Sequence, residues 1–408
     1  MRRLGLFLLL LLPALPLPAC TTAVISGKAT KDGRPILWKN RDAADIHNQV
    51  FYGRDGRFPY LGVVNRGDVA GLQIWAGVND QGFAIMNNVS YNVETKGEDS
   101  AMEGTLMKLA LQSCATVDDF QALLERSNFG GRDVAANFGV VDAKGGAAYF
   151  EADAKGFKRF DAATAPGGFL VRANYSHSGK RGEGAGFIRE ARAQELVSGL
   201  HQEGRLLPET LLTEVCRDTA NTRIGSFPAR TRSGFAYIGD SLSRHETSSC
   251  FVLAGVKPGE APALSTAWVV LGLPVTGVAV PLWVEAGVAP AEVATQKDFA
   301  PLHAAFDRVR LHLYPEQPGE LKRYLSVPRL YDPKEGLLEP FLALERENFA
   351  SVREGLKAGI PRRELQERVT RQTHARVLEV LTAKRIPESG SGERRATRLM
   401  SEVPACGR

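Results

Sequence analysis

The chain has 408 residues, of which 44% are hydrophobic and 24% are charged. This balance is ordinary for a soluble globular protein and is enough for one large domain or two small ones. The formal net charge is +5, and the basic residues are dispersed except for a modest excess near the C-terminus. A charge of this size steers nothing strongly, so we expect neither nucleic acid nor a charged membrane as a partner.

The N-terminal segment has the pattern of an export signal. Two arginines precede an apolar run of about 14 residues. Leu17 and Ala19 occupy the −3 and −1 positions of a possible cleavage site before Cys20. Three prolines in this segment disfavour a membrane-spanning helix. We therefore predict a signal peptide over residues 1–19 and a mature protein that is periplasmic or secreted, with no membrane span.

Short apolar runs separated by turn residues predict strands in the first half of the chain. The first two strands are joined at Asp32-Gly33, a dipeptide that favours hairpin turns. A longer segment with apolar residues at helical spacing predicts a helix over residues 102–126. The expected strands cover residues 21–28, 34–40, 60–64, 72–78, 81–90, 136–143, 146–153 and 167–176.

The second half mixes helices and strands before it turns helical. Helices are expected over 187–200 and 208–216, and Pro208 suits a first helical turn. Two batches of strands with helices between and after them predict an α+β fold. We expect a catalytic domain over 20–295, a helical segment packed on it over 296–386, and a mobile tail over 387–408. The remaining expected elements are strands at 234–240, 248–256, 267–273 and 277–284, and helices within 336–356 and 362–381.

The five cysteines do not form a disulfide scaffold. Their odd number leaves at least one thiol unpaired within the chain, and no CxxC pair occurs. We interpret three of them as buried core residues and single out Cys20. The seven histidines show no ligand-like spacing, so we predict neither a metal site nor a cofactor. The other cysteines are Cys114, Cys216, Cys250 and Cys406.

Cleavage before Cys20 would create a residue with two reactive groups. A free α-amine, with an ordinary pKa of about 8, would stand next to a thiol with an ordinary pKa of about 8.5. The amine can take the thiol proton directly or through water, so one residue can be both nucleophile and general base. The following Thr-Thr enters a predicted strand at once, which places the nucleophile at a strand end.

Four motifs in order resemble the N-terminal-nucleophile hydrolases. The likeness is to the penicillin acyltransferase-like and choloylglycine hydrolase-like branches, which begin after processing with Cys-Thr, a strand, a DG-type turn and a second strand. The match extends from about Cys20 to Val284, roughly two thirds of the chain. The motifs are CTTAVISGKATKDGRPILWKNRD at 20–42, GVNDQGFAIMNN at 77–88, GGFLVRANYS at 167–176 and GDSLSRHETSS at 239–249.

The resemblance implies a four-layer αββα sandwich and a reaction at the C–N bond of a small-molecule amide. Cys20 would attack the carbonyl to form a thioester, while its α-amine moves the proton. Asp42 would hold the amine or thiol in place. Asn88 and Asn174 would face the oxyanion or the amine, and Arg244 would stabilise local charge. One oxyanion donor contributes roughly 3–4 kcal/mol of barrier.

The chain departs from the family pattern at two positions. Lys39 stands where the choloylglycine branch has arginine, which keeps the charge but loses the planar fork. Tyr175 replaces the histidine of the acyltransferase-like branch. Asn87 precedes Asn88, and strand alternation allows only one of the two to face the site. Asn88 is the better match to the motif.

A second hypothesis makes Cys20 a lipid attachment point. Leu17-Pro18-Ala19-Cys20 partly fits a bacterial lipoprotein box, in which the thiol is lipidated and the amine acylated. Both catalytic groups would then be blocked, so the protein would be a surface lipoprotein that binds a ligand or partner without catalysis. Proline before the alanine is poor for that box. The substrate and the oligomeric state stay open at this stage.

Overall fold

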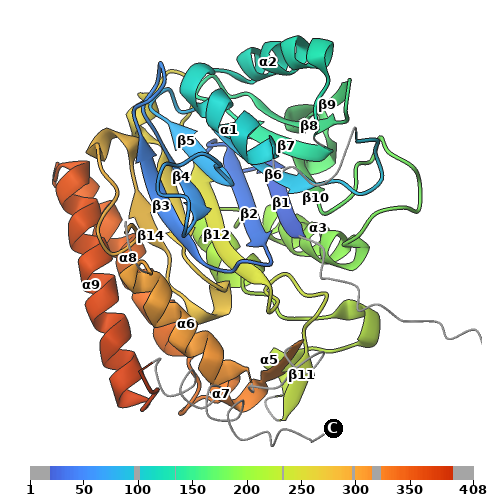
Figure 1. Ribbon diagram of the computed structural model, residues 1–408. Coiled ribbons are helices and arrows are strands. Elements are labelled where there is room, and N and C mark those ends of the chain that lie inside the picture. Colours follow the sequence, from blue (N-terminus) through green and yellow to red (C-terminus); the bar gives the residue numbers. More distant parts are fainter. Residues whose placement is uncertain are drawn as a thin grey trace, which may run out of the picture.

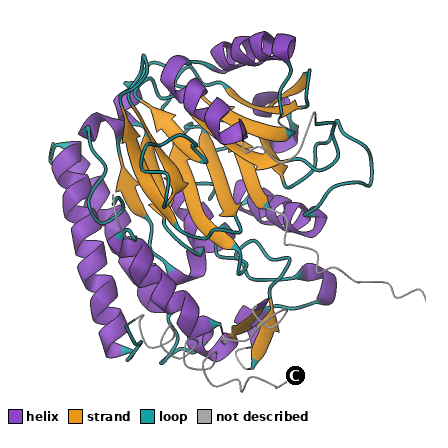
Figure 2. Cartoon of the chain, in the orientation of Figure 1, coloured by secondary structure: helices purple, strands orange, loops and turns teal. Residues whose placement is uncertain are grey.

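The computed structural model describes residues 19–95, 102–133, 135–231, 234–295, 299–314 and 323–388. In this part of the chain the strands form two antiparallel sheets that lie against each other, with helices packed around them (Figures 1 and 2). The fold is α+β, as predicted. The predicted signal peptide up to residue 18, and the tail beyond residue 388, lie outside the described residues.

The smaller sheet contains the N-terminal hairpin. Its strand order is β10-β1-β2-β12-β13-β14. The turn between the first two strands passes through Gly33, whose φ of 77° is the left-handed conformation that a DG turn requires. The strands are β1 (Cys20–Ile25), β2 (Ile36–Asp42), β10 (Phe169–Arg172), β12 (Thr247–Ala254), β13 (Thr266–Val270) and β14 (Val280–Leu282).

The larger sheet follows chain order from β3 to β9. The sequence pattern missed two of its strands, the edge strands β3 and β9, because polar side chains interrupt their apolar alternation. In the smaller sheet, β10 ends earlier than expected, at Arg172, so Asn174 lies beyond the strand. The strands are β3 (Asn48–Gly53), β4 (Tyr60–Asn65), β5 (Ala76–Asn79), β6 (Ala84–Val89), β7 (Ala136–Val141), β8 (Ala147–Ala152) and β9 (Phe157–Asp161).

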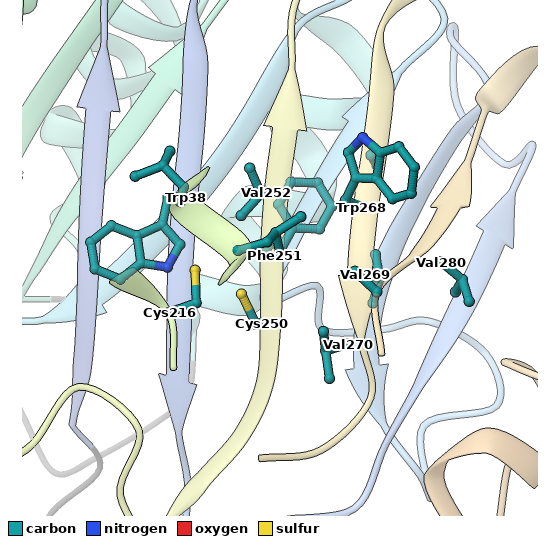
Figure 3. Packing of buried hydrophobic residues seen from close by; sticks show 14 of the residues in the cluster. Trp38, Cys216, Cys250, Phe251, Val252, Trp268, Val269, Val270 and Val280 are labelled. Carbon is teal, nitrogen blue, oxygen red and sulfur yellow. The ribbon is translucent and has the colours of Figure 1, made fainter. Parts of the chain in front are cut away.

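The main hydrophobic core runs between the sheets and across the far face of the smaller one. Figure 3 shows part of it, where Trp38, Phe251 and Trp268 pack with aliphatic side chains of neighbouring strands. Each fully buried side chain of this kind stabilises the fold by roughly 1.5–3 kcal/mol. The same core holds Cys216 and Cys250, both fully buried and unbonded by disulfides, as we predicted from their apolar surroundings.

Two helices cover the outer face of the larger sheet, in place of the single helix predicted over 102–126. α1 (Met102–Ser113) and α2 (Val117–Gly130) are separate because a capping box interrupts the chain. The Thr116 hydroxyl accepts from Asp119 N at 3.1 Å, and the Asp119 carboxylate accepts from Thr116 N at 2.9 Å. Such a box starts a new helix. Phe120 of α2 packs edge-on against Phe138 and Phe150 of the sheet.

The remaining helices lie on the side of the smaller sheet. α3 (Phe187–Gln202) packs on β1 and β10, while the two long C-terminal helices pack on β14 and on each other (Figure 1). Glu345 and Gln366 accept hydrogen bonds from backbone N–H groups beside β14, at 2.8 Å and 3.1 Å. The other elements are α4 (Pro208–Thr210), α5 (Pro228–Thr231), β11 (Phe235–Tyr237), α6 (Pro301–Leu313), β15 (Tyr324–Ser326), α7 (Val327–Tyr331), α8 (Leu338–Lys357) and α9 (Arg362–Ala383).

No helix in the described part of the chain combines the length and the apolar character that crossing a bilayer requires.

Candidate active site

A cavity of about 290 Å³ opens where β1 and β2 end, beside the larger sheet. It brings together the start of β1, the end of β2 and the neighbouring ends of β5 and β6. Cys20 lies at its wall. The lining residues are Cys20, Lys39, Arg41, Asp42, Ala43, Ala44, Asp45, Asn65, Trp75, Asn87, Val89 and Glu103.

The register of the first hairpin sorts the side chains between two faces. Cys20 is opposite Arg41, and Thr22 is opposite Lys39. Residues paired directly across an antiparallel ladder point to the same side, and neighbours along a strand point to opposite sides. Cys20, Lys39 and Arg41 therefore face the larger sheet and the cavity, whereas the side chain of Asp42 faces the other way.

The backbone of Cys20 is held by side chains from the loop after β10 and from α3. Cys20 N donates to Asn174 Oδ1 at 2.9 Å, and Cys20 O accepts from Arg189 Nη1 at 2.6 Å. Arg189 Nη2 also donates to Asn174 Oδ1 at 2.9 Å. Ala19 precedes Cys20 in the structure, so this nitrogen is a peptide amide. It occupies the place that the α-amine would take after cleavage.

Asn174 lies in the loop that follows β10 and is tied to the larger sheet. Its Nδ2 donates to Val89 O at 3.0 Å, which ties the loop to the end of β6. Its backbone bridges to Ala185. Both contacts fix the amide so that its oxygen faces Cys20 N, consistent with the predicted role of Asn174 near the amine.

Asp42 and Arg244 form a buried pair on the other face of β2 from Cys20. Asp42 Oδ2 accepts from Arg244 Nε at 2.7 Å, and Oδ1 accepts from the Thr247 hydroxyl at 2.8 Å. Burial raises the pKa of Asp42, and the charges of Arg244 and Arg189 oppose that rise. The side-chain contacts of Asp42 are with this far-face network, so it can act on Cys20 by charge and by positioning.

Lys39 is buried and lines the same cavity as Cys20. Its Nζ donates to Asn87 Oδ1 at 2.6 Å and to Trp75 O at 2.8 Å. Burial lowers the pKa of Lys39 to about 8, and the negative charge that Cys20 can carry opposes the shift. An ammonium in this position can stabilise a thiolate or an oxyanion, but it can also lose its proton near neutral pH.

The structure adds Arg41 to the cavity wall, a residue that we did not single out from the sequence. Its guanidinium donates to Asn48 Oδ1 at 2.7 Å and to Asn65 Oδ1 at 2.8 Å, and lies 4.6 Å from the centre of the Trp75 ring. Burial lowers the pKa of Arg41 to about 10. Strand alternation was the available signal, because Arg41 is two residues from Lys39.

The two neighbouring asparagines have different surroundings. Asn88 is fully buried, and its Nδ2 donates to the Thr22 hydroxyl at 2.7 Å and to Arg172 O at 3.2 Å. Its Oδ1 accepts from Asn137 at 2.8 Å. Asn87 lines the cavity instead and touches Lys39. The geometry therefore separates the two residues, with Asn88 holding strands together and Asn87 lining the cavity with Cys20.

Arg189 was also absent from the sequence-based site. It belongs to α3 and is 2% exposed. Arg189 continues the buried stripe of Ala193 and Val197 toward the helix N-terminus, at four-residue steps. That spacing is the signal that could have found it, because a charge on a buried stripe needs a partner.

Tyr175 points away from the cavity. Its hydroxyl donates to Glu190 Oε1 at 2.6 Å, and the same carboxylate oxygen contacts His177 Nε2 at 2.7 Å. The departure from the family pattern at this position therefore lies in a separate network. Within the described residues, no group of three or more histidine, cysteine or acidic side chains is arranged to hold a metal ion.

Comparisons with known proteins point to one family. Residues 29–195 match the family described as acyl-coenzyme A:6-aminopenicillanic acid acyl-transferase. A search of curated protein sequences found no match.

Several solved structures are similar at low identity. A conjugated bile acid hydrolase variant from Clostridium perfringens shares 11% identity over 62% of this chain and 89% of its own, with a TM-score of 0.38. An N-acylethanolamine-hydrolyzing acid amidase ortholog from Caenorhabditis elegans shares 15% over 59% and 94%, with a TM-score of 0.37. Penicillin V acylase from Agrobacterium tumefaciens shares 11% over 65% and 85%, with a TM-score of 0.35.

The family match confirms the resemblance that the sequence motifs suggested. The matched segment starts after Cys20 and contains Lys39, Asp42, Asn88 and Asn174. Over residues 29–195 the chain is similar to the acyl-coenzyme A:6-aminopenicillanic acid acyl-transferase family, and this similarity agrees with an amidase or acyltransferase of the N-terminal-nucleophile class.

Proposed function

We propose that the protein is an exported cysteine amidohydrolase or acyltransferase that acts on linear amides. Removal of residues 1–19 would free the amine of Cys20, and the reaction would pass through a thioester on its sulfur. One observation carries the proposal. The Cys20 nitrogen rests on Asn174 Oδ1 at 2.9 Å, while its side chain shares a cavity wall with the cation of Lys39.

The two faces of the hairpin would have different roles in the reaction. The α-amine, oriented by Asn174, takes the thiol proton, and the sulfur attacks the amide carbon. The amine then passes its proton to the leaving nitrogen, which departs as the C–N bond breaks. Water or an acceptor amine attacks the thioester, and the thiol of Cys20 is restored. Lys39 favours the thiolate by its charge.

We assign the oxyanion to Asn87 rather than to Asn88. Asn87 Oδ1 accepts from Lys39, and its Nδ2 makes no hydrogen bond within the described residues, so its N–H groups can serve a ligand in the cavity. Asn87→Ala should lower kcat by about 100-fold or more. Asn88→Ala should chiefly lower the free energy of unfolding, by about 1–3 kcal/mol, because it leaves buried groups unpaired.

The proposal is tested by replacing the nucleophile. Cys20→Ala should abolish hydrolysis across a panel of N-acyl amides, and Cys114→Ala, a buried cysteine remote from the cavity, should not. Undiminished turnover by Cys20→Ala would overturn the proposal.

The mass of the mature chain separates this function from the lipoprotein hypothesis. An unmodified chain that starts at Cys20 supports the enzyme. A lipid adduct on Cys20, or an active chain that keeps its leader, contradicts it, because either would block the amine.

A further inference from the structure

The cavity beside Cys20 holds two buried cations whose partners are neutral. Lys39 donates to a carbonyl and to an amide oxygen, and Arg41 donates to two amide oxygens and, at 3.5 Å, to the Ser248 hydroxyl. Neither side chain forms an ion pair with a carboxylate in the part of the chain that the structure describes. Buried cations are usually paired, because burial without a counter-charge is costly.

The acidic residues of the cavity wall do not pair directly with Lys39 or Arg41. Asp42 turns its carboxylate to Arg244. Asp45, whose side chain is half exposed, contacts His47 Nδ1 at 2.9 Å. Glu103 attracts both cations through its charge. The thiolate of Cys20 would complement one cation during turnover, and the guanidinium of Arg41 is then the group best placed for a ligand anion.

Arg41 is held in a fixed orientation. Amide oxygens of Asn48 and Asn65 hold its two terminal nitrogens, and Trp75 lies under its plane. These contacts engage about three of the five N–H donors of a guanidinium, so roughly two remain for a ligand. The Trp75 indole N–H is also buried without an acceptor among the described residues. The N–H groups of Arg41 that remain suit a planar carboxylate.

The position of Arg41 limits where the anion can lie on a substrate. Arg41 is directly opposite Cys20 in the ladder, and paired Cα atoms are about 4.5–5.5 Å apart. A group bound by Arg41 is therefore only a few bonds from the attacked carbonyl. The cavity volume is about 290 Å³. A cavity of about 150 Å³ accommodates benzene, so this cavity has room for only a small group.

We propose that Arg41 is a specificity-determining residue that binds a carboxylate of the amide substrate, close to the scissile bond. The inference rests on the proposed function, because it names the substrate class of the same site. The carboxylate can belong to an amino acid on the leaving side or to a short dicarboxylic acyl group. The shared chemistry is an amide with a carboxylate a few bonds from its carbonyl.

The first experiment needs no substrate. The rate of Cys20 alkylation is measured with iodoacetate, which is anionic, and iodoacetamide, which is neutral, and each modified peptide is quantified by mass. We expect the iodoacetate-to-iodoacetamide ratio at Cys20 to exceed that of free cysteine in the same buffer by about tenfold. Arg41→Met should lower this excess severalfold, and Arg54→Met, which changes an exposed arginine, should leave it unchanged. A wild-type ratio equal to that of free cysteine would overturn the inference.

The second experiment compares acids with their methyl esters. One pair carries the carboxylate on the leaving side, as in an N-acylglycine, and one on the acyl side, as in an N-succinyl amide. We expect kcat/KM to favour one acid over its ester by about 10- to 100-fold, the size of a charge-assisted hydrogen bond. Arg41→Met should lower this preference mainly through KM, and Arg41→Lys should keep part of it.

The outcomes separate the two proposals. Equal turnover of acids and esters by the wild type would contradict the role of Arg41 and leave the amidase function standing. Turnover that persists in Cys20→Ala would contradict the amidase function, while the alkylation ratio would still report on the cavity charge. The thermal midpoint of Arg41→Met shows whether the variant is folded.

Discussion

The two faces of β2 differ in whether their charged side chains have a partner of opposite charge. On the far face, Asp42 is paired with Arg244 at 2.7 Å and capped by Thr247 at 2.8 Å. On the cavity face, Lys39 and Arg41 are buried among neutral oxygens. Four consecutive residues, Lys-Asn-Arg-Asp, thus supply one face with the carboxylate of a matched pair and the other with two cations.

The difference indicates what each face contributes. A matched and hydrogen-bonded pair is costly to break, because removal of one partner leaves an uncompensated charge. Cations without a counter-ion oppose folding through their desolvation, and such groups concentrate at functional sites. We therefore expect far-face substitutions to act mainly on stability and cavity-face substitutions mainly on activity.

The largest stability effect is expected on the far face. Arg244→Met leaves the buried carboxylate of Asp42 with one neutral partner, so the free energy of unfolding should fall by about 3–5 kcal/mol. Urea unfolding measures the change. The double variant Asp42→Asn with Arg244→Met removes both charges and should recover part of the loss. A single variant within about 1 kcal/mol of the wild type would contradict the contrast between the faces.

The corresponding substitution on the cavity face is Lys39→Met. It removes the cation beside Cys20, and kcat/KM should fall by about 100- to 1,000-fold. Stability should fall less than in Arg244→Met, since relief of the buried charge offsets the hydrogen bonds lost by Asn87 and Trp75. Steady-state kinetics and urea unfolding on the same preparation separate the two effects. A variant that loses stability while each folded molecule keeps full activity would reverse the interpretation.

The lowered pKa of Lys39 predicts a pH dependence of activity. Lys39 keeps its charge below its pKa of about 8 and loses it above, so kcat/KM should decline about tenfold per pH unit beyond that value. Stability should respond in the opposite sense. The unfolded chain, with an ordinary lysine pKa of 10.5, binds more protons between the two values, so this group makes the free energy of unfolding rise with pH.

Lys39→Arg isolates that effect, because an arginine keeps its charge across the range. Its alkaline decline in kcat/KM should move upward by at least about one pH unit relative to the wild type. Superimposable pH profiles between about pH 6 and 10 would show that another group controls the decline.

Local signals predicted the elements that position the nucleophile. The DG turn between the first two strands and the burial of Cys216 and Cys250 follow from short-range rules. The resemblance also brought Asn174 to Cys20, across 154 residues of sequence, which no local rule can do.

The other features of the site depended on how segments distant in the sequence pack together. Alternation showed that only one of Asn87 and Asn88 could face the cavity, but the choice required the position of β6 over the smaller sheet. Arg189 resembles a solvated arginine until α3 is placed on β1. The segment predicted as helical over 102–126 is helical but divided into two helices, because the Thr116 capping box starts a new helix.

The smallest predicted effect concerns the support of Arg189. Gly186 has φ of 86°, and a Cβ there would lie 2.4 Å from Arg189 Nη2 and 2.7 Å from Ala173 Cβ. Gly186→Ala should therefore displace the guanidinium that holds Cys20 O, in addition to a backbone cost of about 1–2 kcal/mol. We expect a severalfold loss of kcat/KM beyond the loss of stability.

Gly182→Ala is the matched control. Gly182 lies in the same loop with φ of 82°, but a Cβ there would meet nothing within 4 Å. It should show the backbone cost alone, so the difference between the two variants measures the displacement of Arg189. Equal kcat/KM in both variants would mean that Arg189 tolerates the displacement and that Asn174 alone holds Cys20 in register. A loss confined to Gly186→Ala would show that the far face, although it mainly stabilises the fold, also positions the atoms that react on the cavity side.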